Sequence, residues 1–499
     1  MPMFFETHPE RLKNHDLLKQ AAFVAGKWLP KASDAQTFTV SNPSTSEKIA
    51  ELPDLGVAET RTAIDAAHVA QVGWAKRTGK ERAGIMRRWH DLMIQNADDL
   101  AAILCAEMGK PLAEAKGEIL YGASYIEWFA EEAKRIYGDT IPGHQPDKRI
   151  MVIRQPVGVV ASITPWNFPN AMIARKVAPA LAVGCAFVAK PAAETPLSAL
   201  AMAALAEKAG LPSGLFSVVT SRMGSEIGKE FCSNPKVRKL TFTGSTEVGR
   251  ILMRQSADQV MKTSMELGGN APFIVFDDAD IDAAVEGAMI SKYRNNGQTC
   301  VCANRIYVQA SVYDVFAEKL TAAVNAISVG DGFEEGVSAG PLIDAKAVEK
   351  VEEHIANAVQ LGARVKAGGK THKRGGTFFE PTILANVTKK MKIASEETFG
   401  PVAALFKFDT VDDVIVQAND TIFGLASYFY ANDLSRVWKV AEALEYGMVG
   451  VNTGLISTEV APFGGVKQSG QGREGSRYGT EDYLEMKYIC MGGIGENQK

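Results

Sequence analysis

The sequence predicts an α/β protein with two open α/β domains, the first of them Rossmann-like, and a small β element. Three observations support this fold class. From residue 157, apolar runs alternate with glycine or proline turns and with helical patterns, as in an open parallel sheet. The same alternation begins again at residues 271–276. The chain, at 499 residues, is also too long for one ordinary core.

The part before residue 157 is predicted to be mainly helical. Residues 1–20 are charged, and we expect them to form a loosely attached leader. Short strands are predicted over residues 23–29 and 37–41. Apolar residues at helical spacing predict helices over 57–77, 80–95, 97–108 and 112–137, and Gly138 would end the last one. Residues 149–155 alternate as a strand.

The first repeated unit has predicted strands at 157–164, 186–190, 215–220 and 239–243, with helices at 171–181 and 196–209. The second has strands at 271–276, 306–309, 403–408 and 450–452. Residues 481–491 form a last alternating strand, with Leu484, Met486, Tyr488 and Cys490 on one face. That strand needs a sheet to join, and a partner subunit is a candidate.

Composition narrows the function. The chain has 46% hydrophobic and 22% charged residues, as in a soluble globular protein. Its 54 basic and 58 acidic side chains give a net charge of -4, which argues against nucleic acid or an anionic membrane as partner. The N-terminus lacks an apolar secretory segment, and the six cysteines are scattered. We therefore expect a cytoplasmic protein without a disulfide scaffold, and we predict no metal site.

Cys300 is the first candidate for chemistry. It follows Gly297-Gln298-Thr299, a polar run that suggests a turn presenting the thiol to a cleft. A free thiol has a pKa of about 8.5, so a nucleophile here needs a base, a positive group or a helix N-terminus nearby. A packing cysteine is the alternative.

Four other stretches could support that thiol. Asn167 lies in a proline-bounded turn after a buried strand, where a fixed amide could hold an oxyanion. Lys190 ends the next strand and would point into a nucleotide crevice, or into solvent. Residues 243–249 open a helix whose N-terminus could hold a pyrophosphate, or they form an ordinary capped turn. Glu266 precedes a glycine pair and could be a general base or a surface acid.

Together these motifs resemble the aldehyde dehydrogenase superfamily over residues 23–493. The resemblance is carried by six motifs in order: Pro-Trp-Asn-Phe-Pro (165–169), Lys-Pro (190–191), Phe-Thr-Gly-Ser (242–245), Glu-Leu-Gly-Gly-Asn (266–270), Gly-Gln-Thr-Cys (297–300) and Glu-Glu-Thr-Phe-Gly-Pro (396–401).

The resemblance implies a role for each matching residue. Cys300 would be the nucleophile, Glu266 the general base, and Asn167 with the backbone N–H of Cys300 the oxyanion hole. Lys190 would touch the adenosine ribose, and Glu397 the nicotinamide ribose. The cofactor-binding residues would be Thr164, Pro165, Trp166, Lys190, Ala193, Gly244, Ser245, Leu267, Glu397 and Phe399.

A narrower likeness concerns the substrate. Residues 173–176, 294–302 and 454–457 and the region 463–488 are similar to the succinate-semialdehyde dehydrogenases. That branch holds the distal carboxylate of its substrate with two arginines and a serine, here Arg175, Arg294 and Ser457. A guanidinium pairs with a carboxylate bidentately, which fits this role. Glutarate semialdehyde is an alternative, because one methylene is worth only about 1–3 kcal/mol of discrimination.

The cofactor and a possible redox switch also follow from the resemblance. Members that prefer NAD carry a glutamate three residues after the lysine, where this chain has Ala193, so NADP is the preferred cofactor. Glu194 could take that place if the loop shifts, and NAD would then be favoured. Cys302 could close a reversible disulfide with Cys300, as related enzymes carry the same pair, or it could be a spectator.

The implied domains are a cofactor-binding domain (1–137 and 158–267), a catalytic domain (268–465) and an oligomerisation element (138–157 and 478–499) that builds homodimers or homotetramers. Two readings from other classes stay open. The chain could be a cysteine-dependent acyltransferase or esterase using Cys300 and Glu266, or a nucleotide-binding protein without catalysis.

Overall fold

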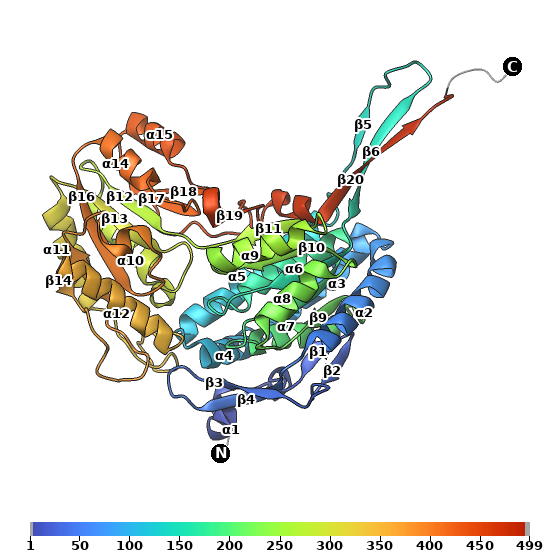
Figure 1. Ribbon diagram of the computed structural model, residues 1–499, viewed down its shortest axis with the longest axis horizontal. Helices are drawn as coiled ribbons and strands as arrows, with labels where there is room; N and C mark the ends of the chain where they lie inside the picture. The colour runs from blue at the N-terminus through green and yellow to red at the C-terminus, as the bar shows by residue number, and fades with distance from the viewer. Residues whose placement is uncertain (1–2, 495–499) are drawn as a thin grey trace.

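The computed structural model describes residues 3–494 of the chain. The first 2 and last 5 residues of the sequence therefore lie outside the described part, including the end of the predicted oligomerisation element. Two α/β units lie side by side, and a three-stranded arm projects from the larger one (Figure 1). Within residues 3–494, no helix combines the length and the apolar character that crossing a membrane requires.

The larger unit contains an eight-stranded sheet. Its strands, in spatial order, are β19 (Gly470–Gln471), β11 (Lys262–Glu266), β10 (Val237–Thr243), β7 (Val159–Ile163), β8 (Ala186–Lys190), β9 (Phe216–Val218), β1 (Ala22–Val24) and β2 (Lys27–Leu29). The five strands from β11 to β9 are parallel, and the strand order reverses between β7 and β10. Ligands of open α/β sheets bind at such a reversal, beyond the carboxyl ends of the strands.

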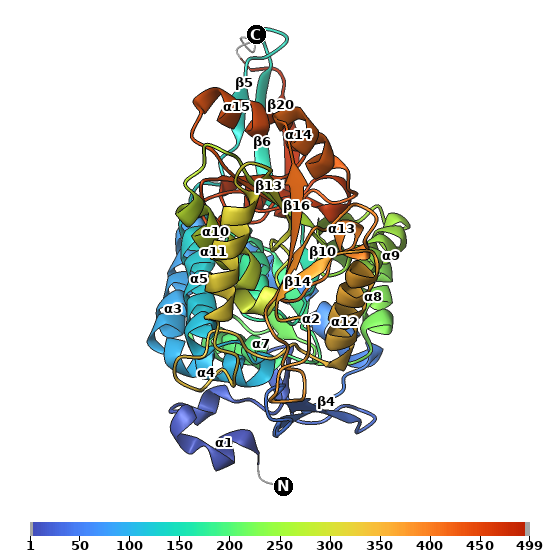
Figure 2. The same cartoon turned by 90° about the vertical axis from the view of Figure 1, so that its left-hand side faces the viewer.

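Eight helices accompany this sheet: α2 (Val57–Ala75), α3 (Gly79–Gln95), α4 (Ala97–Met108), α5 (Leu112–Glu132), α6 (Ala171–Val183), α7 (Leu197–Lys208), α8 (Gly224–Ser233) and α9 (Thr246–Ala257). Helices α3 to α7 pack together, whereas α2, α8 and α9 form a second group. A hairpin of β3 (Thr37–Ser41) and β4 (Lys48–Pro53) lies at the N-terminal end, away from the arm (Figure 2).

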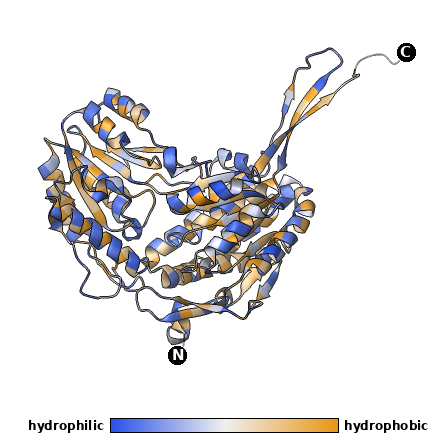
Figure 3. Ribbon diagram, in the orientation of Figure 1, coloured by the Kyte–Doolittle hydropathy of each residue, from blue (hydrophilic) through white to orange (hydrophobic). Residues whose placement is uncertain are grey.

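The smaller unit contains a seven-stranded sheet in the order β14 (Arg364–Ala367), β15 (Thr382–Ala385), β16 (Val402–Phe408), β13 (Ala303–Gln309), β12 (Ala271–Val275), β17 (Ala426–Tyr430) and β18 (Met448–Val451). Its helices are α10 (Ile281–Tyr293), α11 (Tyr313–Asn325), α12 (Ala345–Gln360), α13 (Lys392–Ser395), α14 (Val411–Asn419) and α15 (Leu434–Ala443). Phe273 and Ile274 of β12 are buried in the cores on opposite faces of this sheet. The apolar strands between more polar helix surfaces are visible in Figure 3.

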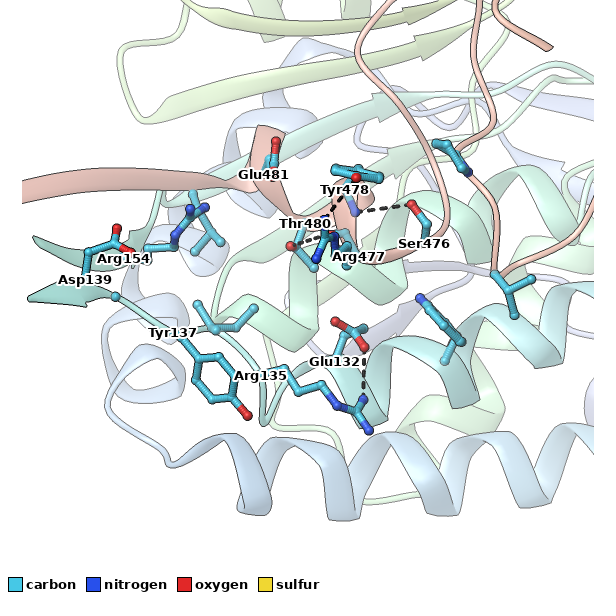
Figure 4. Close-up of a pocket in the computed structure, with 16 residues that line it drawn as sticks. Glu132, Arg135, Tyr137, Asp139, Arg154, Ser476, Arg477, Tyr478, Thr480 and Glu481 are labelled. Carbon is cyan, nitrogen blue, oxygen red and sulfur yellow. Dashed lines mark hydrogen bonds and ion pairs between the residues drawn. The ribbon is translucent and has the colours of Figure 1, made fainter.

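The arm is a separate antiparallel sheet of β5 (Asp139–Ile141), β6 (Arg149–Pro156) and β20 (Leu484–Met491). The last predicted strand therefore finds its sheet within its own chain, by pairing with β6. Met486 and Tyr488 on β20 remain 71% and 60% exposed. A cavity of about 660 Å³ lies at the base of the arm, and charged side chains such as Arg135, Arg154 and Glu132 line it (Figure 4).

Three local expectations need correction. The leader is not loosely attached, because Phe4 and Phe5 of α1 (Phe4–Thr7) are buried and the Phe4 ring packs 5.6 Å from that of Phe333. The strand predicted over 23–29 is a tight hairpin, β1 and β2, whose turn residues Ala25 and Gly26 both have positive φ. The helix predicted over 112–137 ends at Glu132, where the chain turns toward β5. Short 3-10 turns complete the described chain: η1 (Pro9–Arg11), η2 (His15–Leu17), η3 (Arg294–Gly297), η4 (Lys467–Ser469) and η5 (Arg477–Tyr483).

Candidate active site

Cys300 lies at the end of a tightly folded loop between α10 and β13. Asn295 and Asn296 have φ of 52°, in the left-handed region that asparagine tolerates better than most residues. Gly297 has φ of 76°, and a Cβ there would lie 2.2 Å from the carbonyl oxygen of Gly400. Only glycine fits this position, so backbone geometry requires the glycine of the Gly-Gln-Thr-Cys motif.

The Cys300 side chain lies where two cavities meet, one of about 240 Å³ and one of about 20 Å³. Burial raises the pKa of its thiol to about 12, although the charge of Arg175 acts in the opposite direction. A nucleophilic role for Cys300 would therefore need a base or a further positive charge near the thiol.

Asn167 lines the larger cavity together with Cys300. Its Nδ2 donates one hydrogen bond to the carbonyl oxygen of Gln298 at 3.0 Å, which leaves the second N–H for an oxyanion. Its own backbone carbonyl accepts from Lys110 Nζ at 2.8 Å and from Asn295 Nδ2 at 3.0 Å. The predicted oxyanion donor is thus bonded to the loop that carries Cys300.

Glu266 ends β11 and is buried, yet it lines neither cavity. Neither carboxylate oxygen has a hydrogen-bond partner in the described chain, and Oε1 lies near Gly464, where a Cβ would be 2.9 Å away. Burial and the charge of Glu474 raise its pKa well above the usual range, against the effect of Arg175 and Lys176. A base in this position must rotate toward Cys300 or act through water.

A buried ion cluster beside Glu266 was not predicted. Glu474 accepts a hydrogen bond from Arg175 Nε at 2.6 Å, and its other oxygen contacts Lys176 Nζ. Burial would raise the pKa of Glu474, but these two cations lower it below its ordinary value. The Arg175 guanidinium also lies 4.0 Å from the centroid of the Phe463 ring. Glu474 lies 299 residues from Arg175 in the chain, so no local pattern reveals the pair.

The smaller cavity brings together all three residues of the predicted carboxylate clamp. Arg175, Arg294 and Ser457 line it with Cys300. The two arginines differ, because Arg175 is paired with Glu474, whereas Arg294 forms no ion pair with any carboxylate of residues 3–494. The Arg294 guanidinium lies 4.8 Å from the centroid of the Phe168 ring. Arg294 is therefore the freer cation for an anionic ligand.

The larger cavity has a lining that suits the nicotinamide side of a dinucleotide. Seven of the predicted cofactor residues line it: Pro165, Trp166, Gly244, Ser245, Leu267, Glu397 and Phe399. Ser245 caps α9 by accepting from the N–H of Val248, so the helix N-terminus faces this region. Glu397 Oε1 accepts from the N–H of Gly269 at 3.1 Å, and burial raises its pKa to about 7. Apolar walls, a helix N-terminus and one carboxylate fit the nicotinamide, its ribose and the pyrophosphate of such a cofactor.

Three predicted cofactor residues do not line this cavity. Thr164 is buried, with no hydrogen-bond partner for Oγ1 in the described chain. Lys190 Nζ donates to the carbonyl oxygen of Pro191 at 3.2 Å, and burial lowers its pKa against the charges of Glu194 and Asp54. Ala193 is half-buried. Conversely, Lys350 of α12 lines the cavity and was missed, because a lysine on an amphipathic helix gives no signal of a site.

Cys302 lies outside both cavities. Its thiol is buried, and its Sγ donates to the carbonyl oxygen of Lys292 at 3.5 Å. Both Cys300 and Cys302 are free thiols in this structure.

Comparison with known proteins adds to this geometry. The sequence model of the aldehyde dehydrogenase family matches residues 28–489. The chain is 66% identical over 484 residues to a glutarate-semialdehyde dehydrogenase of Pseudomonas aeruginosa, covering 97% of this chain and 100% of the relative. It is 63% identical over 482 residues to a succinate-semialdehyde dehydrogenase (NADP(+)) of Escherichia coli, covering 97% and 100%. A crystal structure of succinate-semialdehyde dehydrogenase from Burkholderia pseudomallei superimposes with a TM-score of 0.95 at 61% identity, covering 96% of this chain and 99% of that one.

Proposed function

Because this chain belongs to the aldehyde dehydrogenase family, we propose that it oxidises succinate semialdehyde to succinate with NADP as the preferred cofactor. The observation that carries the proposal is the shared cavity, in which an arginine without an ion pair in the described chain, Arg294, lies close to the nucleophile Cys300. A short aldehyde with a carboxylate at its far end meets both groups. NAD is the alternative cofactor. The preference for NADP is supported by the name of the Escherichia coli relative, which specifies NADP(+).

The residues divide the reaction into two stages. The Cys300 thiolate adds to the aldehyde carbon, and the second N–H of Asn167 with the backbone N–H of Cys300 stabilises the oxyanion. A nicotinamide cofactor held beside Glu397 and Phe399 would supply the hydride acceptor, and departure of hydride from the adduct would leave a thioester on Cys300. Glu266 then takes a proton from water, which adds to the thioester and releases the acid. Aldehyde, water and oxidised cofactor give acid, reduced cofactor and one proton.

The structure also bears on whether the substrate is succinate semialdehyde or the longer glutarate semialdehyde. The smaller cavity, of about 20 Å³, holds little more than one water, so a substrate enters only when lining side chains shift. Glutarate semialdehyde is the second candidate, supported by the relative of that name at 66% identity.

The arm supports a proposed homodimer or homotetramer. It presents exposed apolar side chains such as Met486 and Tyr488 beside an open strand edge, which a second copy would cover. The proposed compartment is the cytoplasm, which fits the six free cysteines. Light scattering of the purified protein measures the subunit number, and a monomer at all concentrations would contradict the proposal.

Absorbance at 340 nm tests the function directly. Purified enzyme should reduce NADP with succinate semialdehyde, more slowly with glutarate semialdehyde, and much more slowly with uncharged butanal. A Cys300→Ala variant should lose turnover and keep cofactor binding by calorimetry. Ester hydrolysis without any cofactor reduction would favour the acyltransferase or esterase reading, and cofactor binding without either reaction would favour the non-catalytic one.

A further inference from the structure

A buried ion pair lies behind the oxyanion donor. Lys110 Nζ contacts Glu118 Oε2 at 2.7 Å and the backbone carbonyl of Asn167 at 2.8 Å. The other oxygen of Glu118 accepts from the N–H groups of Asn170 and Ala171 at 2.9 and 3.2 Å. The side chains of Lys110 and Glu118 are 1% and 0% exposed. The turn that carries Asn167 is therefore held at both of its ends by charge-assisted hydrogen bonds.

Residues 110–118, which contain Lys110 and Glu118, also contact the loop that carries Arg294. Glu114, one turn before Glu118 on α5, accepts at 2.8 Å from the N–H of Asn295, the residue after Arg294. Phe168 joins the two sides, because its ring centroid lies 3.8 Å from Lys110 Nζ and 4.8 Å from the Arg294 guanidinium. Such cation–ring contacts are attractive and directional.

We propose that Lys110, Glu114 and Glu118 are positioning residues that fix the separation between the oxyanion donor Asn167 and the cation Arg294, and so select the length of the substrate. The proposal rests on the proposed oxidation of a carboxylated aldehyde. None of the three residues lines either cavity, so each acts through a residue that does.

The free-energy cost of burying the Lys110–Glu118 ion pair supports a positioning role. Apolar side chains of the same volume would fill this space at equal or lower free energy, because burying two charges is expensive. The ion pair instead supplies hydrogen bonds of fixed direction to one backbone carbonyl and two backbone N–H groups. Fixed direction is what a separation between two substrate-binding groups requires, since a displacement of about 1 Å can lower a rate about 100-fold.

Glu118→Gln is the primary test. Glutamine still offers an oxygen to Asn170 and Ala171, but it removes the charge from Lys110. At saturating NADP, we expect kcat/KM for succinate semialdehyde to fall by about 100-fold, as for a displacement of about 1 Å. Displacement of Asn167 slows every aldehyde, whereas displacement of Arg294 slows only the carboxylated ones. Because Glu118 also reaches Arg294 through Lys110 and the Phe168 ring, the ratio of kcat/KM for succinate semialdehyde to that for butanal, and to that for glutarate semialdehyde, should fall as well.

Glu107→Gln is the matched control. Glu107 is also buried, and it accepts from the N–H groups of Leu197 and Ser198 at 2.7 and 2.8 Å, at the start of α7. It lines neither cavity. We expect both substrate ratios to stay unchanged. Ratios depend on active molecules only, so a partly unfolded preparation does not mimic the effect.

Two outcomes would overturn the inference: wild-type ratios in Glu118→Gln, or an equal change in Glu107→Gln. If Glu118→Gln does not fold, two variants of Glu114 test the proposal instead. Glu114→Gln keeps an acceptor for the N–H of Asn295 and should keep the ratios, whereas Glu114→Ala should lower them, and equal ratios in both variants would refute the role. A wild-type enzyme that does not prefer carboxylated aldehydes would instead refute the proposed function.

Discussion

Replacing Arg294 and Arg175 in turn by methionine should separate substrate binding from stability. Methionine keeps an unbranched apolar stem in both positions. Arg294 has no ion pair to lose within residues 3–494, whereas Arg175 is one of two cations that pair with the buried Glu474. The two arginines of the predicted clamp therefore have different primary partners in the substrate-free protein.

The contacts of each arginine set the expected losses of activity and of stability. Loss of one side of a buried, hydrogen-bonded charge pair costs about 2–5 kcal/mol, so Arg294→Met should lower kcat/KM for succinate semialdehyde at least about 30-fold. Its effect on folding is limited to the contact with Phe168, about 0.5–1 kcal/mol. Arg175→Met leaves Glu474 with one cation instead of two, and breaking such a buried pair costs about 3–5 kcal/mol of stability.

Two assays measure these effects. Steady-state kinetics with succinate semialdehyde and butanal report on the clamp, and urea denaturation reports on stability. Arg294→Met should change the kinetics for the carboxylated aldehyde and unfold near the wild-type urea concentration. Arg175→Met should unfold at clearly lower urea. The reasoning is refuted if Arg175→Met is as stable as wild type, or if Arg294→Met slows both aldehydes equally.

Three further predictions concern the base, the cofactor and the second thiol. Glu266→Gln should give one burst of reduced cofactor and then stall, because the thioester cannot be hydrolysed. The pKa of Glu266 is raised in the folded state, so the wild type loses stability as pH rises from about 4.3 toward that pKa. The loss is up to about 1.4 kcal/mol per pH unit. The melting temperature of Glu266→Gln should therefore increase relative to that of the wild type over this pH range. Glu194→Gln removes a negative charge near Lys190 and should raise kcat/KM for NADP relative to NAD by about fivefold, as one surface charge is worth about 1 kcal/mol; no change would leave Glu194 without a role in cofactor choice. Peroxide should inactivate wild type through a Cys300–Cys302 disulfide that dithiothreitol reverses, and should inactivate Cys302→Ser irreversibly; peptide mass mapping without that disulfide would show the switch to be wrong.

The regular elements could be predicted where side-chain period and backbone signals agree. The helix over residues 97–108 was predicted to the residue, because its apolar pattern ends at Gly109, which has φ of 88°. The strand over 186–190 was equally clear, since every residue in it is apolar or terminal and all five are buried. The leader was misjudged, because its charged residues conceal four buried apolar side chains, Phe4, Phe5, Leu12 and Leu17.

The site was predictable where it is local and not where it is assembled from distant segments. The positive φ of Gly297 and the helix cap made by Ser245 are local features that the sequence indicates, although it does not indicate the contact of Gly297 with Gly400. The pairing of Arg175 with Glu474 depends on two segments 299 residues apart, and it decides which arginine is free for a ligand. The position of Glu266, beside the ion cluster and outside both cavities, is likewise a property of the assembled fold.

Three of the predicted site residues keep buried polar atoms without a partner in the described chain, at a cost in stability. Among the described residues, the Glu266 carboxylate, Asn167 Oδ1 and Thr164 Oγ1 are buried with no hydrogen-bond partner. Each such atom costs about 1–3 kcal/mol, so folding alone would favour apolar replacements here. Lys110 and Glu118, which are equally buried and contact the turn that carries Asn167, have hydrogen-bond partners for their charged atoms. A substrate, a cofactor or a reacting water can satisfy these three groups, whereas Lys110 and Glu118 already hold the turn that carries Asn167.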